Sequence, residues 1–134
     1  MARLILDTGV LVAAARGILD PAQLPDVDDV ALPAVVVAEY LAGVLLDDDA
    51  GRRAAQRAFL EDVLAVTPVE DYDSTIAEHH AELLAHVRKT GSKRGSHDLV
   101  VAATARATGR VLVTTDERAR FDQLPEVRAR IIAT

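Results

Sequence analysis

The chain alternates short apolar segments with longer segments of helical periodicity, and this alternation limits the folds that it can adopt. The clearest apolar segments are Arg3–Leu6 and Arg110–Thr115, which are followed by turn residues or an acid. Strands that alternate with helices favour a parallel sheet with helices on both faces. We therefore expect an α/β protein, a three-layer α/β/α domain with a central parallel sheet. Shorter strands are expected at Ala31–Leu32, Val66–Val69 and Arg130–Ala133.

The expected helices are bounded by residues that commonly begin or end helices. Asp or Pro stands near the start of several of them, and a glycine follows two. The helix that follows Pro33 is apolar nearly all round, so we expect it to be buried on more than one side. No linker or repeat divides the chain, and we expect one domain over residues 1–134. The helices are expected at Val10–Ala15, Ala34–Leu46, Arg52–Leu64, Asp71 or Asp73 to Lys89, and Leu99–Thr108, with loops at Leu19–Asp29 and Ser92–His97.

Composition excludes several kinds of chemistry. Cysteine is absent, so disulfides, thiolate metal sites and thiol catalysis are excluded. Aromatic residues make up only 3% of the chain, which argues against a stacking platform for single-stranded bases. The apolar segments are too short for a secretory signal or a membrane span, and we expect a cytoplasmic protein with no membrane partner.

The formal net charge of −6 conceals an uneven distribution. Residues 1–85 carry 5 Lys and Arg against 16 Asp and Glu, whereas residues 86–134 carry 10 against 5. A basic region could attract an anionic substrate, although a solvated charged surface is the alternative interpretation. The residues that could hold phosphate groups are Lys93, Arg94 and Arg118, with Arg120 as a further candidate.

Four carboxylates stand beside apolar segments: Asp7, Glu39, Asp98 and Asp116. Two carboxylates about 4 Å apart repel by about 4 kcal/mol at the effective dielectric of a protein surface, so such a cluster needs a cation. Sites in parallel sheets form beyond the carboxyl ends of the strands, and Asp7 and Asp116 stand at or just beyond such ends. Oxygen ligands without cysteine suit Mg²⁺ or Mn²⁺.

Each of these acids also has a simpler structural explanation. Asp7 could form a turn with its own backbone, Asp98 could cap a helix, and Asp116 could cap the turn that follows it. Glu39 is harder to explain in this way because it lies inside an apolar helix, where an unpaired buried charge costs several kcal/mol.

The four motifs together resemble a known family. The segments LILDTGVLV, PAVVVAEYLAG, GSHDLVVAATARATG and VLVTTD followed by RFDQLPEV resemble, in this order, a PIN domain of the VapC ribonuclease toxins in bacterial type II toxin-antitoxin systems. The resemblance covers essentially the whole chain. It implies a three-layer PIN-like fold with an acidic pocket for one or two Mg²⁺ or Mn²⁺ ions. It implies catalytic roles for Asp7, Glu39, Asp98 and Asp116, metal binding by Asp7, Asp98 and Asp116, and supporting hydroxyl groups on Thr8 and Thr115.

The resemblance also implies an activity and partners. The activity is hydrolysis of RNA phosphodiester bonds by a metal-activated water, and the partners are the RNA substrate and a cognate antitoxin protein. The apolar helix Ala34–Leu46 exceeds what one small core can cover, so we expect a homodimer and an antitoxin-binding groove. A PIN nuclease of RNA processing without an antitoxin, or a non-catalytic protein-interaction domain, are the alternatives. The chain departs from many relatives at His97 and Ala119, where Asn and an acid are common.

Overall fold

A five-stranded sheet forms the centre of the protein. The structure is a computed structural model that describes residues 2–19 and 29–134. The strand order is β3-β2-β1-β4-β5, and every neighbouring pair is parallel. The expected α/β class with a parallel sheet is therefore confirmed. The strands are β1 (Arg3–Leu6), β2 (Asp29–Pro33), β3 (Val69–Glu70), β4 (Val111–Thr114) and β5 (Ala129–Ile131).

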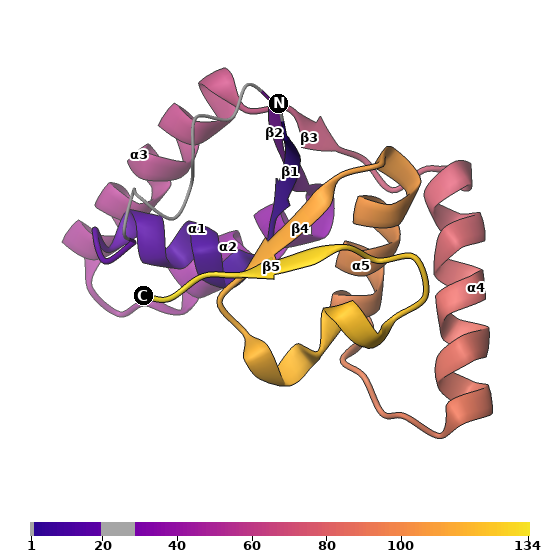
Figure 1. Ribbon diagram of the computed structural model, residues 1–134. Helices are drawn as coiled ribbons and strands as arrows, with labels where there is room; N and C mark the ends of the chain where they lie inside the picture. Colours follow the sequence, from indigo (N-terminus) through magenta and orange to yellow (C-terminus); the bar gives the residue numbers. More distant parts are fainter. Residues whose placement is uncertain (1, 20–28) are drawn as a thin grey trace.

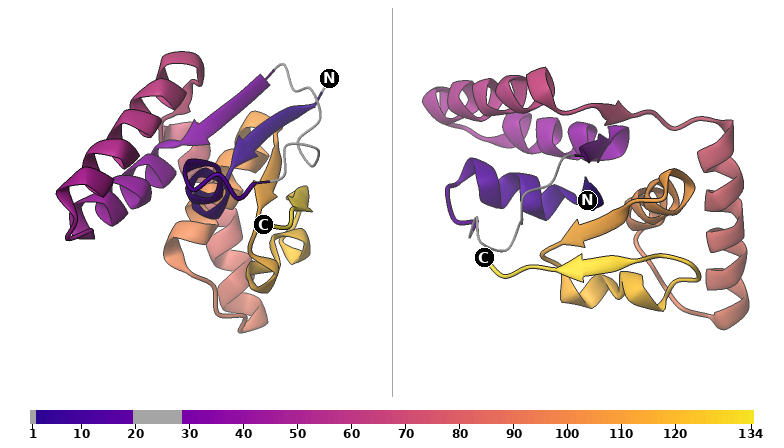
Figure 2. Two further views of the ribbon diagram at one scale, coloured as in Figure 1. Left: turned by 90° about the vertical axis from the view of Figure 1, so that its left-hand side faces the viewer. Right: turned by 45° about the horizontal axis from the view of Figure 1, so that its top comes forward.

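The helices form two groups around this sheet. In Figure 1, α4 and α5 lie side by side at one end of the molecule, and α2 and α3 lie together at the other. The turned views in Figure 2 show the same two pairs. None of the described helices is long and apolar enough to cross a membrane. The helices are α1 (Thr8–Ala15), α2 (Ala34–Leu46), α3 (Ala50–Val66), α4 (Ser74–Thr90) and α5 (Ser96–Thr108), with short 3₁₀ helices η2 (Glu117–Ala119) and η3 (Phe121–Gln123).

The sheet is the middle of three layers because its central strands bury consecutive residues. Leu4 of β1 and Val113 of β4 pack with Val10 of α1 in one apolar cluster. Their neighbours Ile5 and Leu112 belong to a larger cluster, to which α2, α4 and α5 contribute. Consecutive strand residues point to opposite faces, so both faces of the sheet are covered. The expected three-layer arrangement is confirmed.

Local capping residues set most of the helix boundaries as expected. Asp49 and Asp73 accept hydrogen bonds from the backbone at the starts of α3 and α4. Gly91 ends α4 with a φ of 66°, a left-handed conformation that glycine adopts without steric cost. The aspartate and glycine signals therefore predicted these boundaries correctly.

Several predicted boundaries differ from the structure by a few residues, and two of them change the type of element assigned. The strand expected at Val66–Val69 is shifted, because Val66 is the last residue of α3 and β3 is Val69–Glu70. The loop expected to reach His97 ends earlier, since α5 begins at Ser96. Pro68 directly precedes β3 and Gly95 is the N-cap of α5, so both boundaries carry a local signal that the prediction did not use. The loop expected at Leu19–Asp29 lies largely outside the described residues, and Asp29 begins β2.

Helix α2 is less buried than its apolar sequence predicts. Its fully buried residues are Val36, Tyr40 and Val44, which form a single line along the helix. On the other side Leu45 and Leu46 are 73% and 81% exposed. Val35, Val37 and Leu41 on the flanks of this line also pack against the core, so the expected burial on more than one side holds in part, while Leu45 and Leu46 at the end of the helix stay uncovered.

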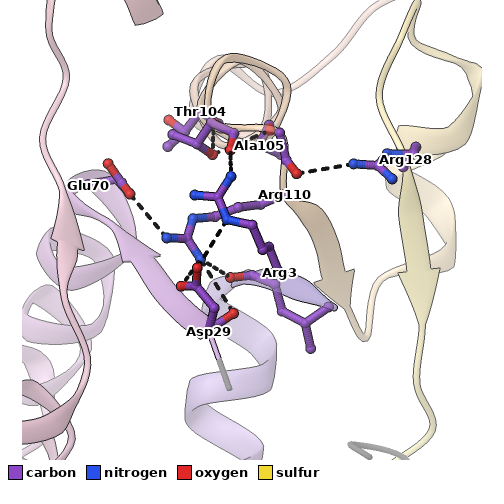
Figure 3. A network of polar contacts seen from close by, with 10 residues as sticks. Arg3, Asp29, Glu70, Thr104, Ala105, Arg110 and Arg128 are labelled. Atoms are coloured by element: carbon purple, nitrogen blue, oxygen red, sulfur yellow. Dashed lines mark hydrogen bonds and ion pairs between the residues drawn. The ribbon is translucent and has the colours of Figure 1, made fainter. Parts of the chain in front are cut away.

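A buried arginine contacts several strands at the end of the sheet opposite Asp7 and Asp116. Arg110, directly before β4, lies 2.6 Å from the carboxylate of Asp29 and 3.4 Å from that of Glu70 (Figure 3). It also donates a 3.2 Å hydrogen bond to the carbonyl of Leu4. Arg3 binds the same aspartate at 3.0 Å. The contacts of Arg110 thus reach β1, β2 and β3 from the start of β4.

Candidate active site

Asp7 lies between β1 and α1 and is held by two hydrogen bonds. Its Oδ1 accepts from the backbone N–H of Thr8 at 2.8 Å, and its Oδ2 accepts from the hydroxyl of Thr114 at 2.9 Å. The side chain is nearly buried, with 9% exposure. Burial raises the pKa of Asp7 above its ordinary value, the two hydrogen bonds lower it, and the charge of Asp116 raises it further.

Asp116 lies beyond the end of β4 and is oriented by the turn that it caps. Its Oδ1 accepts hydrogen bonds from the N–H groups of Arg118 at 2.9 Å and Ala119 at 3.3 Å. Its own N–H donates to the hydroxyl of Thr114 at 3.0 Å. The Thr114 hydroxyl therefore connects the two acids, Asp7 through its proton and Asp116 through its lone pair.

The sequence predicted hydroxyl support from Thr8 and Thr115, and missed Thr114. The Thr8 hydroxyl is buried and has no hydrogen-bond partner among the described residues. The Thr115 hydroxyl lies against Gly9, where an added Cβ would come within 2.4 Å of it, so only glycine fits this approach. Thr114 is 1% exposed at the last position of β4. A hydroxyl at a buried strand end, beside a predicted acid, is the signal that could have identified it.

Asp98 lies in the first turn of α5 and does not cap that helix. The N-cap is Gly95, and an added Cβ at this glycine would lie 3.1 Å from Asp98 Oδ2. Burial raises the pKa of Asp98, and the negative charges of Asp7, Asp116 and Glu39 raise it further. The electrostatic contacts of Asp98 thus include all three of the other predicted acids.

Glu39 projects from α2 at the edge of this group. Its carboxylate lies 3.7 Å from the ring Nδ1 of His97, the residue before Asp98. Its side chain is 32% exposed, so the expectation of a carboxylate with little access to water is wrong. The exposed face of α2 gives it that access. No neutralising partner is therefore required for Glu39 by burial alone.

A cavity of about 700 Å³ lies beside Glu39, between α1, α2 and α3. Its lining combines apolar side chains with charged ones at the turn between α2 and α3. Residues that line it include Val12, Tyr40, Val44, Phe59, Asp47 and Arg52. Since Glu39 also lines it, the cavity opens next to the acidic group.

The predicted phosphate-binding residues differ in their surroundings. Lys93 and Arg118 are exposed. Arg94 is half-buried, and its guanidinium donates to the backbone carbonyls of Ala119 and of Arg120, the latter at 2.8 Å. Arg120 itself is exposed. Lys93 and Arg118 therefore have the accessibility that phosphate binding requires, whereas Arg94 is engaged with the protein backbone.

The acidic group fits a hard divalent cation that keeps much of its water. In the described ranges 2–19 and 29–134, no three acidic or histidine side chains form a group that could by itself hold a metal ion. Mg²⁺ usually binds one or two carboxylates and completes its shell with waters and substrate oxygens. The donors are carboxylate oxygens, and a bound cation would relieve the repulsion between these neighbouring negative charges. The residues present therefore fit such an ion.

The fold agrees with comparisons to known proteins. The family model of the PIN domain matches residues 4–127. The chain therefore belongs to the PIN-domain family, and its relatives there are VapC proteins. Ribonuclease VapC5 of Mycobacterium tuberculosis is 34% identical over 116 residues, which cover 84% of this chain and 82% of the relative.

Solved structures give the same result. A member of the VapBC family of toxin-antitoxin systems, VapBC-5 from Mycobacterium tuberculosis, matches with a TM-score of 0.79 and 30% identity over 100% of both chains. VapBC2 from Rickettsia felis, solved bound to a DNA fragment from its promoter, matches with a TM-score of 0.84 over 96% of this chain and 97% of the other. Its 22% identity supports the fold alone. The expected PIN-like fold and the resemblance to VapC proteins are confirmed.

Proposed function

We propose that this chain is a Mg²⁺- or Mn²⁺-dependent endoribonuclease and the toxin of a bacterial type II toxin-antitoxin system in the cytoplasm. The observation that carries the proposal is geometric: the Thr114 hydroxyl joins Asp7 and Asp116 at the carboxyl ends of β1 and β4. The charges of these two acids and of Glu39 also raise the pKa of Asp98. Membership of the PIN-domain family and 34% identity to a VapC ribonuclease support the same activity.

Asp7, Asp98 and Asp116 would hold one or two metal ions. A bound ion lowers the pKa of a coordinated water and neutralises charge on the phosphate under attack. Thr114 keeps the Asp7 carboxylate oriented through the hydrogen bond to Oδ2. Glu39, which is partly exposed beside this group, would orient or deprotonate the attacking water. Lys93 and Arg118 would contact the flanking phosphates of the RNA.

Replacing Asp98 with Asn tests the proposal. In the unaltered protein, Mn²⁺ at a hundred times its dissociation constant should raise the free energy of unfolding by about 2.7 kcal/mol, and EDTA should abolish this gain together with RNA cleavage. Asp98→Asn should lose the metal response and cleavage together, because it removes a charge that holds the ion. Thermal melts with and without Mn²⁺, run beside a cleavage assay on structured RNA, measure both. Retained cleavage with an unaltered Mn²⁺ shift would contradict the role of this residue.

The antitoxin would occupy the cavity between α1, α2 and α3. An amphipathic helix could lay its apolar face against Tyr40, Val44 and Phe59 and direct a basic side chain toward Glu39. The solved relative VapBC-5 is a member of the VapBC family of toxin-antitoxin systems, which supports a partner of this kind. A small reading frame next to the gene would support the toxin, and its absence would favour the PIN nuclease of RNA processing.

Exposed leucines on α2 support the homodimer. Leu45 and Leu46 form an apolar surface that the described parts of one chain leave uncovered, and burial of such a surface favours association. Light scattering at micromolar concentration should give twice the mass of one chain. A strict monomer would contradict this part of the proposal.

A further inference from the structure

We infer that Arg94 is a positioning residue that fixes the spacing between Asp98 and Asp116, and that it does not bind substrate phosphate. The inference rests on the proposed metal-dependent activity for its consequence, but its geometric part stands independently. It concerns the contact between the loop before α5 and the turn after β4, which carry the two acids.

The first step is the contact itself. Arg94 donates from one guanidinium nitrogen, Nη1, to the carbonyls of Ala119 and Arg120, 25 and 26 positions further along the chain. Its side chain is half-buried between the two segments. A guanidinium that donates to two backbone carbonyls has exchanged water for fixed partners, and charged hydrogen bonds of this kind are stronger than neutral ones.

The second step leads from this contact to Asp116. The same Ala119 whose carbonyl accepts from Arg94 donates its N–H to Asp116 Oδ1. The Arg118 N–H donates to the same oxygen. The turn that Arg94 holds is therefore the turn that orients the Asp116 carboxylate.

The third step leads to Asp98. Arg94 directly precedes Gly95, the N-cap of α5, and Asp98 lies in the first turn of that helix. Arg94 therefore connects the start of the helix that carries Asp98 to the turn that orients Asp116.

The fourth step is the backbone conformation at Arg120. This residue has φ 49° and ψ 47°, in the left-handed region that non-glycine residues seldom adopt. Its carbonyl accepts from Arg94 and from the N–H of Gln123 at 3.0 Å. Such a conformation persists only when surrounding contacts hold it, and Arg94 supplies one of them.

Two variants and one control test the inference. Arg94→Met removes the donors and keeps the aliphatic length, and Arg94→Lys keeps the charge. Arg88→Met removes an exposed arginine near the end of α4, so it is matched for the loss of charge. The first measurement is hydrogen exchange of the Arg118 and Ala119 amides in EDTA, which needs no metal and no RNA. Arg94→Met should accelerate exchange by about tenfold or more, because it removes charged hydrogen bonds to the turn, and Arg88→Met should leave it unchanged.

The second measurement is the Mn²⁺ concentration at the midpoint of the thermal-shift response. Loss of a residue that orients metal ligands typically weakens metal binding by about 10- to 100-fold, and Arg94→Met should do so. The third is the salt dependence of RNA binding in EDTA. Arg94→Met should keep the slope of the unaltered protein, since no phosphate contact is lost.

The outcomes separate the inference from the proposed function. Unchanged amide exchange in Arg94→Met overturns the inference, as does a slope that falls by about 0.7, the value for one lost phosphate contact on a single strand. If Arg94→Met fails to fold, Arg94→Lys takes its place in the comparison with Arg88→Met. The inference is overturned if amide exchange and the Mn²⁺ midpoint are both unchanged in Arg94→Lys, as they should be in Arg88→Met. If the unaltered protein shows no Mn²⁺ response, the proposed function fails, whereas faster exchange in Arg94→Met still supports the geometric part.

Discussion

The Thr114 hydroxyl donates a 2.9 Å hydrogen bond to Asp7 Oδ2, although the two residues are 107 positions apart in the chain. The Thr114 hydroxyl oxygen also accepts a hydrogen bond from the N–H of Asp116. Because β1 and β4 are paired neighbours, their carboxyl ends bring these three residues together. The orientation of the most buried acid therefore depends on a residue that carries no charge.

Replacing Thr114 with Val should destabilise the protein and disturb Asp7. The buried carboxylate loses a donor and the Asp116 N–H loses an acceptor, so we expect the free energy of unfolding to fall by about 1 to 3 kcal/mol in urea titrations. Thr104→Val is the matched control, because that buried hydroxyl donates to the Val100 carbonyl within α5. Equal losses in the two variants would show that the contact with Asp7 contributes nothing specific.

The metal-free protein should become more stable at neutral pH when Asp98 is replaced with Asn. The folded protein raises the pKa of Asp98, so the ionised carboxylate is less favourable in the folded than in the unfolded state. This cost is absent below about pH 4, where both states are protonated, and it develops as the pH rises through the raised pKa. Urea titrations in EDTA between pH 4 and 8 should show the difference between Asp98→Asn and the unaltered protein grow with pH. Asp62→Asn, on the exposed side of α3, is the control.

Arg110 should matter more for stability than Arg3, although both bind Asp29. The Arg110 side chain is 5% exposed and that of Arg3 is 50% exposed. Arg110→Gln removes a buried cation and a donor to the Leu4 carbonyl, and should cost about 2 kcal/mol. Arg3→Gln should cost less, because water solvates its charge. Chemical denaturation of the two variants measures this order, and a larger loss in Arg3→Gln would contradict it.

Lys93 and Arg118 should contribute to RNA binding through charge alone. If each contacts one phosphate, replacing either with Gln should flatten the salt dependence by about 0.7 log unit of slope on a single strand. The fold should survive, because both side chains are exposed. Binding measured at several salt concentrations in EDTA, with thermal melts as a control for folding, tests this. Unchanged slopes would assign both residues to the solvated surface.

Sequence alone determined the elements and the identity of the acids, because the signals for both are local. Periodicity over a few residues marks a strand or helix, and capping side chains act within three positions, as Asp49 and Asp73 do. Near Val66 and Ser96 the signals of Pro68 and Gly95 were not used, and the predicted boundaries were wrong by a few residues. The order of strands and helices then implied a parallel sheet, whose carboxyl ends gather Asp7 and Asp116.

Only the tertiary structure decided how these acids are held and what surrounds them. Asp7 and its partner Thr114 are 107 positions apart in the chain. Arg94 and Ala119 are 25 positions apart, and Arg110 and Asp29 are 81 apart. No local pattern predicts such pairs. The exposure of Leu45, Leu46 and Glu39 likewise depends on which neighbours pack against α2. A side chain's burial and hydrogen bonds are set by residues that are distant in sequence and adjacent in space, so they follow from packing rather than from periodicity.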